Sequence, residues 1–179
     1  MTKHEAEVRW QRGDGEAFTD RRYSRAHAWH FDGGAVVAAS SSPHSVPLPF
    51  SRADAVDPEE ALVAAIASCH MLTFLFLAAK AGYTVDEYAD AATAEQGTNA
   101  DGRAALTHVT LRPAVVFSGA LVPDDVAVEA LHHRSHDECI IANSVRTAIT
   151  IAGSYRHAAG AASADRSGVA PAHSGSARS

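Results

Sequence analysis

Cysteine is scarce in this sequence: only Cys69 and Cys139 occur in 179 residues, far apart along the chain. A framework of structural disulfides, typical of small secreted domains, is therefore excluded, and a chain of this length can bury a sufficient core without one. The paired spacing that makes zinc predictions specific is also missing. Reaction, metal binding and simple packing remain as roles for the two thiols, and their spacing does not choose among them.

The sequence also lacks an excess of positive charge and a long apolar run. Its formal net charge is -6, so nothing draws the protein toward nucleic acid or an anionic membrane. The longest apolar run, Met71 to Ala79, is too short to span a bilayer. The first ten residues are charged and polar, without the apolar segment of a secretory signal. We therefore expect a cytoplasmic protein that binds neither nucleic acid nor membrane.

The first third of the chain is predicted to be β structure. Residues 5–11 alternate polar and apolar side chains, as a half-buried strand does. Two further short runs, 26–31 and 35–41, flank Asp32-Gly33-Gly34, which is typical of a hairpin turn. Residues 42–55 contain three prolines and are predicted to form a loop.

The segment from Asp57 to about Ala81 carries the signals of a long helix. Asp57 is a suitable N-cap, Pro58 suits the first helical position, and Glu60 can complete a capping box. Gly82 is a typical stop. Because the helix is apolar on nearly all sides, we expect it to be buried as a central helix.

The remainder of the chain alternates strand and helix signals. Strands are predicted at 88–96, 106–117 and 147–155, and a second helix at 126–137. The order of elements indicates an α+β class. We expect one domain over residues 1–156, followed by a disordered tail rich in alanine, glycine and serine over 157–179.

Cys69 lies well inside the predicted long helix. Most free cysteines are small packing residues, and that role is the more common one for a thiol in this setting. A reactive thiolate there needs a cation from elsewhere, because the dipole at the helix N-terminus acts only over the first turn. Arg25 and Arg52 are candidates, and Glu59 could orient either one. A straight helix would separate Glu59 from Cys69 by about 15 Å, so the arginine would have to lie lengthwise between them.

Cys139 follows the second predicted helix and has a similar choice of roles. It can be a packing residue at the helix end. Alternatively, His136 and Cys139 could share a helical face and form a metal site with Cys69 and His70. His70 points about 100° away from Cys69 around the helix, so it is not expected to act as the base for that thiol.

Two segments together resemble the OsmC/Ohr family, the osmotically inducible protein C and organic hydroperoxide resistance proteins. One runs from Asp57-Pro58-Glu59-Glu60 through Ala67-Ser68-Cys69-His70 to Gly82-Tyr83. The other begins at Cys139-Ile140-Ile141, where the family often has proline at the position of Ile140. The resemblance implies an OsmC-like fold, in which antiparallel sheets wrap around long central helices in an intertwined homodimer.

The resemblance also implies the chemistry of a two-cysteine peroxidase with an antioxidant role in stress response. By its pattern Cys69 is the peroxidatic cysteine, Cys139 the resolving cysteine and Glu59 the carboxylate of the site. Arg25 is favoured slightly over Arg52 as the arginine. No cofactor and no metal are implied.

The implied reaction reduces an organic hydroperoxide to an alcohol and ends in a Cys69–Cys139 disulfide, which a lipoyl-type or similar dithiol then reduces. Leu72, Phe74 and Phe76 would give the site an apolar entrance. Two alternatives stay open: a non-catalytic member of the same fold that binds a small apolar ligand, and a Cys/His metal protein.

Overall fold

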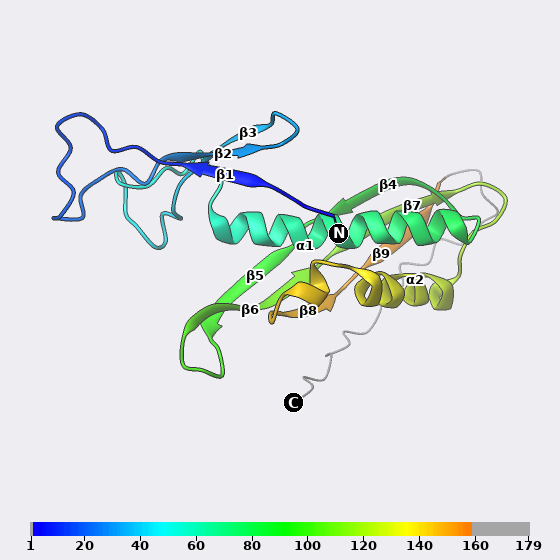
Figure 1. The fold of residues 1–179 in the computed structure, drawn as a ribbon. Coiled ribbons are helices and arrows are strands. Elements are labelled where there is room, and N and C mark those ends of the chain that lie inside the picture. The colour runs from blue at the N-terminus through cyan, green and yellow to red at the C-terminus, as the bar shows by residue number, and fades with distance from the viewer. Residues whose placement is uncertain (1, 159–179) are drawn as a thin grey trace. The chain divides into compact units, whose positions relative to one another are not determined.

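The computed structural model describes residues 2–158, which contain strands, two α-helices and one short 3-10 helix, so the predicted α+β class is confirmed (Figure 1). The predicted tail over 157–179 lies outside the described residues, apart from positions 157 and 158. In chain order the elements are β1 (Ala6–Arg9), β2 (His27–Phe31), β3 (Val36–Ala39), α1 (Pro58–Lys80), β4 (Thr84–Asp90), β5 (Thr93–Thr98), β6 (Ala104–Leu111), β7 (Pro113–Ser118), α2 (Asp125–Glu138), η1 (Ala142–Ser144), β8 (Ala148–Ile151) and β9 (Ser154–His157).

The chain divides into two compact units, one ending at Leu62 and the other beginning at Val63. The division falls inside α1, so the first turn of that helix belongs to the first unit. The single domain expected over residues 1–156 stays a prediction.

The first unit contains the sheet β1-β2-β3, and its pairings are antiparallel. The predicted strand at 5–11 and the predicted hairpin are both confirmed. Gly34 has a φ of 84° in the turn between β2 and β3, a backbone conformation that favours glycine. After β3 the chain pairs again with itself, where Ser40 N donates to Val56 O at 3.0 Å just before α1 begins.

Helix α1 begins with the predicted capping box. Glu60 N donates to Asp57 Oδ1 at 2.8 Å, and Asp57 N donates to Glu60 Oε2 at 3.2 Å. The helix ends beside Gly82, whose φ of 85° lets the chain turn back, and Tyr83 N then donates to Ala78 O at 3.0 Å. Both ends of α1 are therefore set by local sequence.

The expectation that α1 is buried on all sides is only partly right. Its buried side chains form one face, while Leu72 and Phe76 are each 61% exposed in the single chain. Among residues 2–158, α1 is the one helix that is long and apolar enough to cross a membrane by length and composition, with a mean hydropathy of 2.1. The sequence prediction considered only the run Met71–Ala79 and judged it too short to span a bilayer. The apolar character of the helix in fact continues toward its N-terminus across His70 and Ser68. An exposed apolar helix face therefore needs an explanation.

The predicted strands of the second unit are each broken in two, so those boundaries were wrong. Predicted strand 88–96 is the end of β4 and the start of β5, and 106–117 is β6 plus β7. The break between β6 and β7 lies at Arg112, because Pro113 lacks the N–H that would continue the hydrogen-bond ladder of the strand. Arg112 N donates instead to Asp90 Oδ1 at 2.7 Å. Predicted strand 147–155 likewise divides at Gly153 into β8 and β9.

The three breaks lie opposite one another in neighbouring strands. The second unit therefore contains two sheets, β4-β7-β9 and β5-β6-β8. The predicted antiparallel pairing is confirmed for β4 with β7 and for β5 with β6, whereas β9 and β8 join their sheets in parallel.

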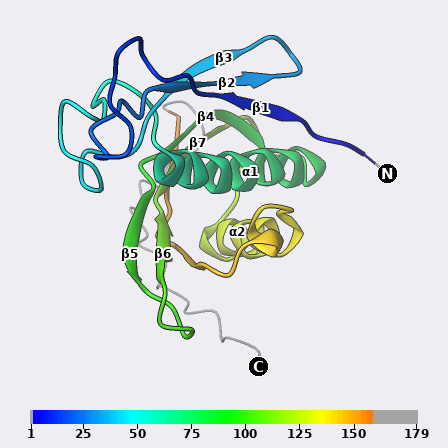
Figure 2. The ribbon, with the colours of Figure 1, turned by 60° about the vertical axis from the view of Figure 1, so that its left-hand side comes forward.

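The core of the second unit forms where α1, α2 and β7 meet. Figure 2 shows α2 beside α1, and Figure 1 shows β4, β7 and β9 running past the later part of α1. Phe74 is fully buried at this junction and contacts the ring of Phe117. The junction packs residues 74–78 of α1 against the first half of α2. Its buried side chains are Phe74, Leu77, Ala78, Val115, Phe117, Val128 and Leu131.

Candidate functional site

The two cysteines meet in the second unit. Both are free thiols, Cys69 half-buried in the middle of α1 and Cys139 buried at the C-cap of α2. Their side chains lie close enough together for Cys69 to raise the pKa of the Cys139 thiol. The structure therefore brings together the two predicted cysteine positions, which the sequence keeps far apart.

Cys139 is held in a turn with many local hydrogen bonds. Ala142 N donates to Cys139 Sγ at 3.3 Å. Asn143 Nδ2 donates to Asp137 O at 2.8 Å and to Cys139 O at 3.0 Å. Ser144 Oγ donates to Ile140 O at 2.7 Å. These bonds fix the backbone of the thiol, which suits a residue that must meet a second sulfur.

Burial raises the pKa of the Cys139 thiol, and the neighbouring Cys69 thiol raises it further. Amide donors at Ala142 and Ile141 act in the opposite direction. Cys139 therefore holds its proton at neutral pH.

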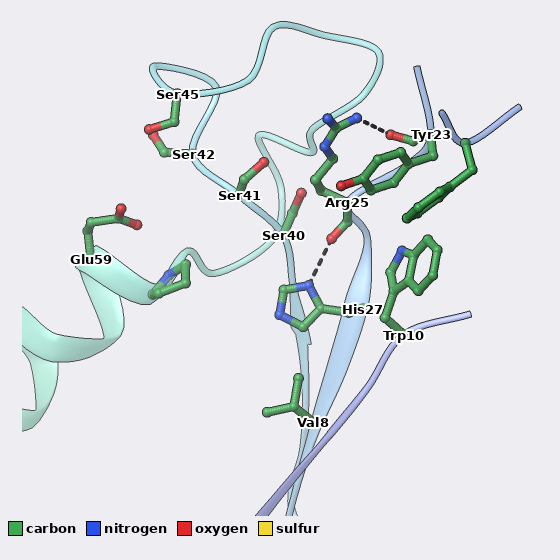
Figure 3. A pocket seen from close by; sticks show the side chains of 12 residues that line it. Val8, Trp10, Tyr23, Arg25, His27, Ser40, Ser41, Ser42, Ser45 and Glu59 are labelled. Atoms are coloured by element: carbon green, nitrogen blue, oxygen red, sulfur yellow. Dashed lines mark hydrogen bonds between the residues drawn. The ribbon is translucent and has the colours of Figure 1, made fainter. Parts of the chain in front are cut away.

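A cavity of about 440 Å³ lies in the first unit, and its lining combines aromatic, hydroxyl and charged side chains (Figure 3). Both Arg25 and Glu59 line it. The residues that line the cavity are Val8, Trp10, Phe18, Tyr23, Arg25, His27, Ser40, Ser41, Ser42, Ser45, Pro58 and Glu59.

One wall of this cavity is an aromatic cluster. The rings of Phe18 and Tyr23 stack with centroids 4.5 Å apart, and Trp10 meets Tyr23 edge-on at 5.5 Å. Trp10 Nε1 donates to Ser24 O at 2.8 Å, which fixes the indole. This apolar wall suits an alkyl or aryl group.

Arg25 lies against the same wall. Its guanidinium carbon is 3.9 Å from the centroid of the Tyr23 ring, and Nη1 donates to the backbone carbonyls of Arg21, at 2.8 Å, and of Tyr23. Within residues 2–158 no carboxylate is ion-paired with Arg25. Arg25 is thus oriented by neutral groups and keeps its positive charge available for a ligand.

Arg52, the other candidate arginine, is engaged elsewhere. It makes a two-pronged ion pair with Asp54, with Nε to Oδ1 at 2.9 Å and Nη2 to Oδ2 at 2.6 Å. The hydrogen bond to Asp54 raises the pKa of Arg52. Arg52 does not line the cavity. The geometry of the first unit therefore favours Arg25.

Several lining residues were missed by the sequence reasoning. The sequence did not single out His27, yet it lines the cavity, with Nδ1 2.8 Å from Arg25 O and Nε2 accepting from Trp29 Nε1 at 2.9 Å. A cluster of aromatic residues between positions 10 and 23, in a chain with only 7% aromatics, was the signal that could have found this wall.

The predicted apolar entrance beside Cys69 needs correction. Phe74 is fully buried in the core, so it cannot line an entrance, whereas Leu72 and Phe76 are exposed. The alternative metal site finds no support in the geometry: among residues 2–158 no group of three or more His, Cys, Asp or Glu side chains is placed to hold a metal ion. His70 is occupied by a hydrogen bond to His132 at 3.1 Å, in keeping with its predicted direction away from Cys69.

Comparison with known proteins identifies the relatives of this chain. Residues 51–153 match the model of the family described as OsmC-like protein. An OsmC-like protein of unknown function from Vibrio cholerae is 51% identical, with a TM-score of 0.82 over 88% of this chain and 100% of that one. No curated protein matches.

More distant structures share the fold. An organic hydroperoxide resistance protein from Elizabethkingia anophelis is 16% identical, with a TM-score of 0.61 over 88% of this chain and 98% of that one. The organic hydroperoxide resistance protein OhrB of Bacillus subtilis is 13% identical, with a TM-score of 0.57 over 87% and 98%. With a family model spanning more than half of its length and a relative at 51% identity, this chain belongs to the OsmC-like protein family.

Proposed function

We propose that this protein is a cysteine-dependent peroxidase that reduces organic hydroperoxides to alcohols. The observation that carries the proposal is that Cys69 and Cys139 lie close enough for one thiol to influence the ionisation of the other. Two neighbouring thiols can be joined as a disulfide when their side chains reach the required bonding geometry. The organic hydroperoxide resistance proteins of the same fold support the choice of substrate class.

In the proposed reaction the Cys69 thiolate attacks the distal oxygen of the hydroperoxide. The O–O bond breaks, the alkoxide takes up a proton and leaves as the alcohol, and Cys69 becomes a sulfenic acid. The Cys139 sulfur then attacks the Cys69 sulfur, its proton leaves with the hydroxyl as water, and a disulfide forms. An external dithiol, of lipoyl or similar type, reduces the disulfide by exchange and is itself oxidised. No metal or cofactor takes part.

We propose, from the resemblance to the OsmC/Ohr family, that Arg25 and Glu59 take part in the reaction of Cys69. A guanidinium without a carboxylate partner can stabilise the thiolate and orient the peroxide oxygens. Glu59 lines the same cavity and can orient Arg25. The aromatic wall beside them would hold the organic group of the substrate, which favours organic hydroperoxides over hydrogen peroxide.

Replacement of each arginine separates the two candidates. Arg25→Ala should lower kcat/KM for cumene hydroperoxide by about 100-fold, because an oriented charge at the reacting atoms is lost. The matched variant Arg52→Ala should stay within about threefold of the wild type, since Arg52 is exposed and paired with Asp54. The reverse order of effects would move the role to Arg52.

We also propose that the exposed apolar face of α1 is covered by a second copy of this chain. Membership of a family with intertwined homodimers favours this occupant over lipid, and Leu72 and Phe76 supply the apolar surface. Phe76→Glu should convert a dimer to a monomer in sedimentation at micromolar concentration. Val126→Glu, at a 75% exposed position of α2, should leave the dimer intact. A wild-type chain that sediments as a monomer would contradict the proposal.

The proposed function is tested by following the two thiols. One equivalent of cumene hydroperoxide should consume both thiols, release one equivalent of cumyl alcohol and give a peptide pair linked through Cys69 and Cys139 in the mass spectrum. Dihydrolipoamide should restore both thiols. A chain that keeps its thiols would instead be a non-catalytic binder of a small apolar ligand, the second candidate, which the cavity in the first unit supports.

A further inference from the structure

A buried pair of histidines connects α1 to α2 beside the cysteines. His70 Nε2 and His132 Nδ1 are 3.1 Å apart, although the residues are 62 positions apart in the sequence. Their rings are nearly parallel, with centroids 5.4 Å apart and an interplanar angle of 11°. Only 1% of His70 and 7% of His132 is exposed. This is a directional bond between the two helices that carry the thiols.

Each histidine is close in sequence to one of the cysteines. His70 follows Cys69 on α1, and His132 precedes Cys139 by seven positions, which is about two turns of α2 and returns to the same face. Two side-chain pairs thus lie between the helices, the two thiols and the two imidazoles, and the imidazole pair is hydrogen-bonded. The bonding between the two sulfurs changes during a redox cycle, whereas the imidazole hydrogen bond need not.

The surroundings hold the pair in place and keep it neutral. The ring of Phe74 stacks on His132 with centroids 4.5 Å apart. On the other side the backbone approaches closely, because a Cβ added to Gly153 would lie 3.0 Å from His132 Nε2. Burial lowers the pKa of His70 to about 3 and that of His132 to about 4. At neutral pH one uncharged ring therefore donates to the other.

If its only role were packing, this histidine pair would stabilise the fold less than apolar side chains would. The outer nitrogens, His70 Nδ1 and His132 Nε2, are buried and have no hydrogen-bond partner among the described residues. Whichever ring donates, one buried N–H stays unpaired, a cost that two leucines would avoid. A polar pair kept under these conditions indicates a need for orientation that apolar packing does not supply.

We infer that the His70–His132 hydrogen bond is a positioning device that holds the α2 end carrying Cys139 against Cys69 through the thiol–disulfide cycle. This inference rests on the redox cycle of the proposed function. His70 and His132 act here through the helices and touch neither substrate nor sulfur. Their role is to keep the two sulfurs at a high effective concentration toward each other.

The test measures that effective concentration without any hydroperoxide. The chain is equilibrated with reduced and oxidised dithiothreitol, and the fraction of Cys69–Cys139 disulfide is read by alkylation and mass spectrometry. His132→Leu should lower the equilibrium constant for disulfide formation by about tenfold, because the directional bond is lost. His132→Asn places an amide near the position of Nδ1 and should recover the wild-type value to within about threefold.

The double variant His70→Leu/His132→Leu is the control that separates loss of positioning from loss of the fold. It leaves no unpaired imidazole, so it should keep the near-ultraviolet circular dichroism of the wild type while its equilibrium constant falls by about tenfold. Folded variants with the wild-type equilibrium constant would overturn the inference. If the wild type forms this disulfide but does not reduce hydroperoxides, the proposed function fails and the positioning role stands. If the wild type forms no disulfide, both fail.

Discussion

Replacement of Cys69 by serine should reduce the rate of hydroperoxide reduction at least about 1000-fold. A serine hydroxyl stays protonated at neutral pH and does not attack a peroxide oxygen, so the first bond-forming step is lost. The variant should bind hydroperoxide in the cavity but release no alcohol. Stopped-flow measurement of the single-turnover reaction with cumene hydroperoxide, in the absence of a reductant, checks this.

Cys139→Ser is the matched control because it removes only the second sulfur. Its first turnover should stay within about threefold of the wild type, but the reaction should stop at the Cys69 sulfenic acid, which dimedone captures. Excess hydroperoxide should then oxidise Cys69 further to the sulfinic acid. If Cys139→Ser, rather than Cys69→Ser, abolished the first turnover, the roles of the two cysteines would have to be exchanged.

The folded protein should lose stability steeply as the pH falls below about 6.5. Burial depresses the pKa of His70 to about 3 and of His132 to about 4, from an ordinary value of 6.5. A neighbouring titratable group, His136, also lowers the pKa of His70. Both rings are therefore neutral in the folded chain at pH 5, whereas both are protonated in the unfolded chain.

The direction of this change in stability follows from the number of protons that each state binds. Between about pH 5.5 and pH 4.5 the unfolded chain holds two more protons at these sites, so the free energy of unfolding should fall by about 2.7 kcal/mol for each pH unit. The stabilisation is complete above pH 6.5 and is lost as the pH approaches 4 and then 3. Asp90, whose pKa burial raises, works in the opposite direction at the lower end of this window.

Urea unfolding at several pH values between 4.5 and 7 measures this slope. His132→Leu should halve it to about 1.4 kcal/mol for each pH unit, and His70→Leu/His132→Leu should remove the histidine contribution. A slope equal to that of the wild type in the double variant would assign the acid sensitivity to other groups.

The sequence by itself determined the elements whose signals are local. The capping box of Asp57 and Glu60, the stop at Gly82 and the hairpin around Gly34 all use atoms within a few residues, and the structure has them where they were predicted. The family could be identified for the same reason, because its two cysteine motifs are short and contiguous. The α+β order of the chain follows from these local patterns.

Only the tertiary structure decided how distant residues combine. The break at Arg112 depends on Asp90 from another strand, and the bond between His70 and His132 joins two helices. The resemblance favoured Arg25 only slightly, and the further support for it comes from spatial partners, since Arg52 is paired with Asp54 whereas Arg25 lies on the Tyr23 ring. Burial and hydrogen bonding between remote segments depend on packing, which short-range sequence patterns do not encode.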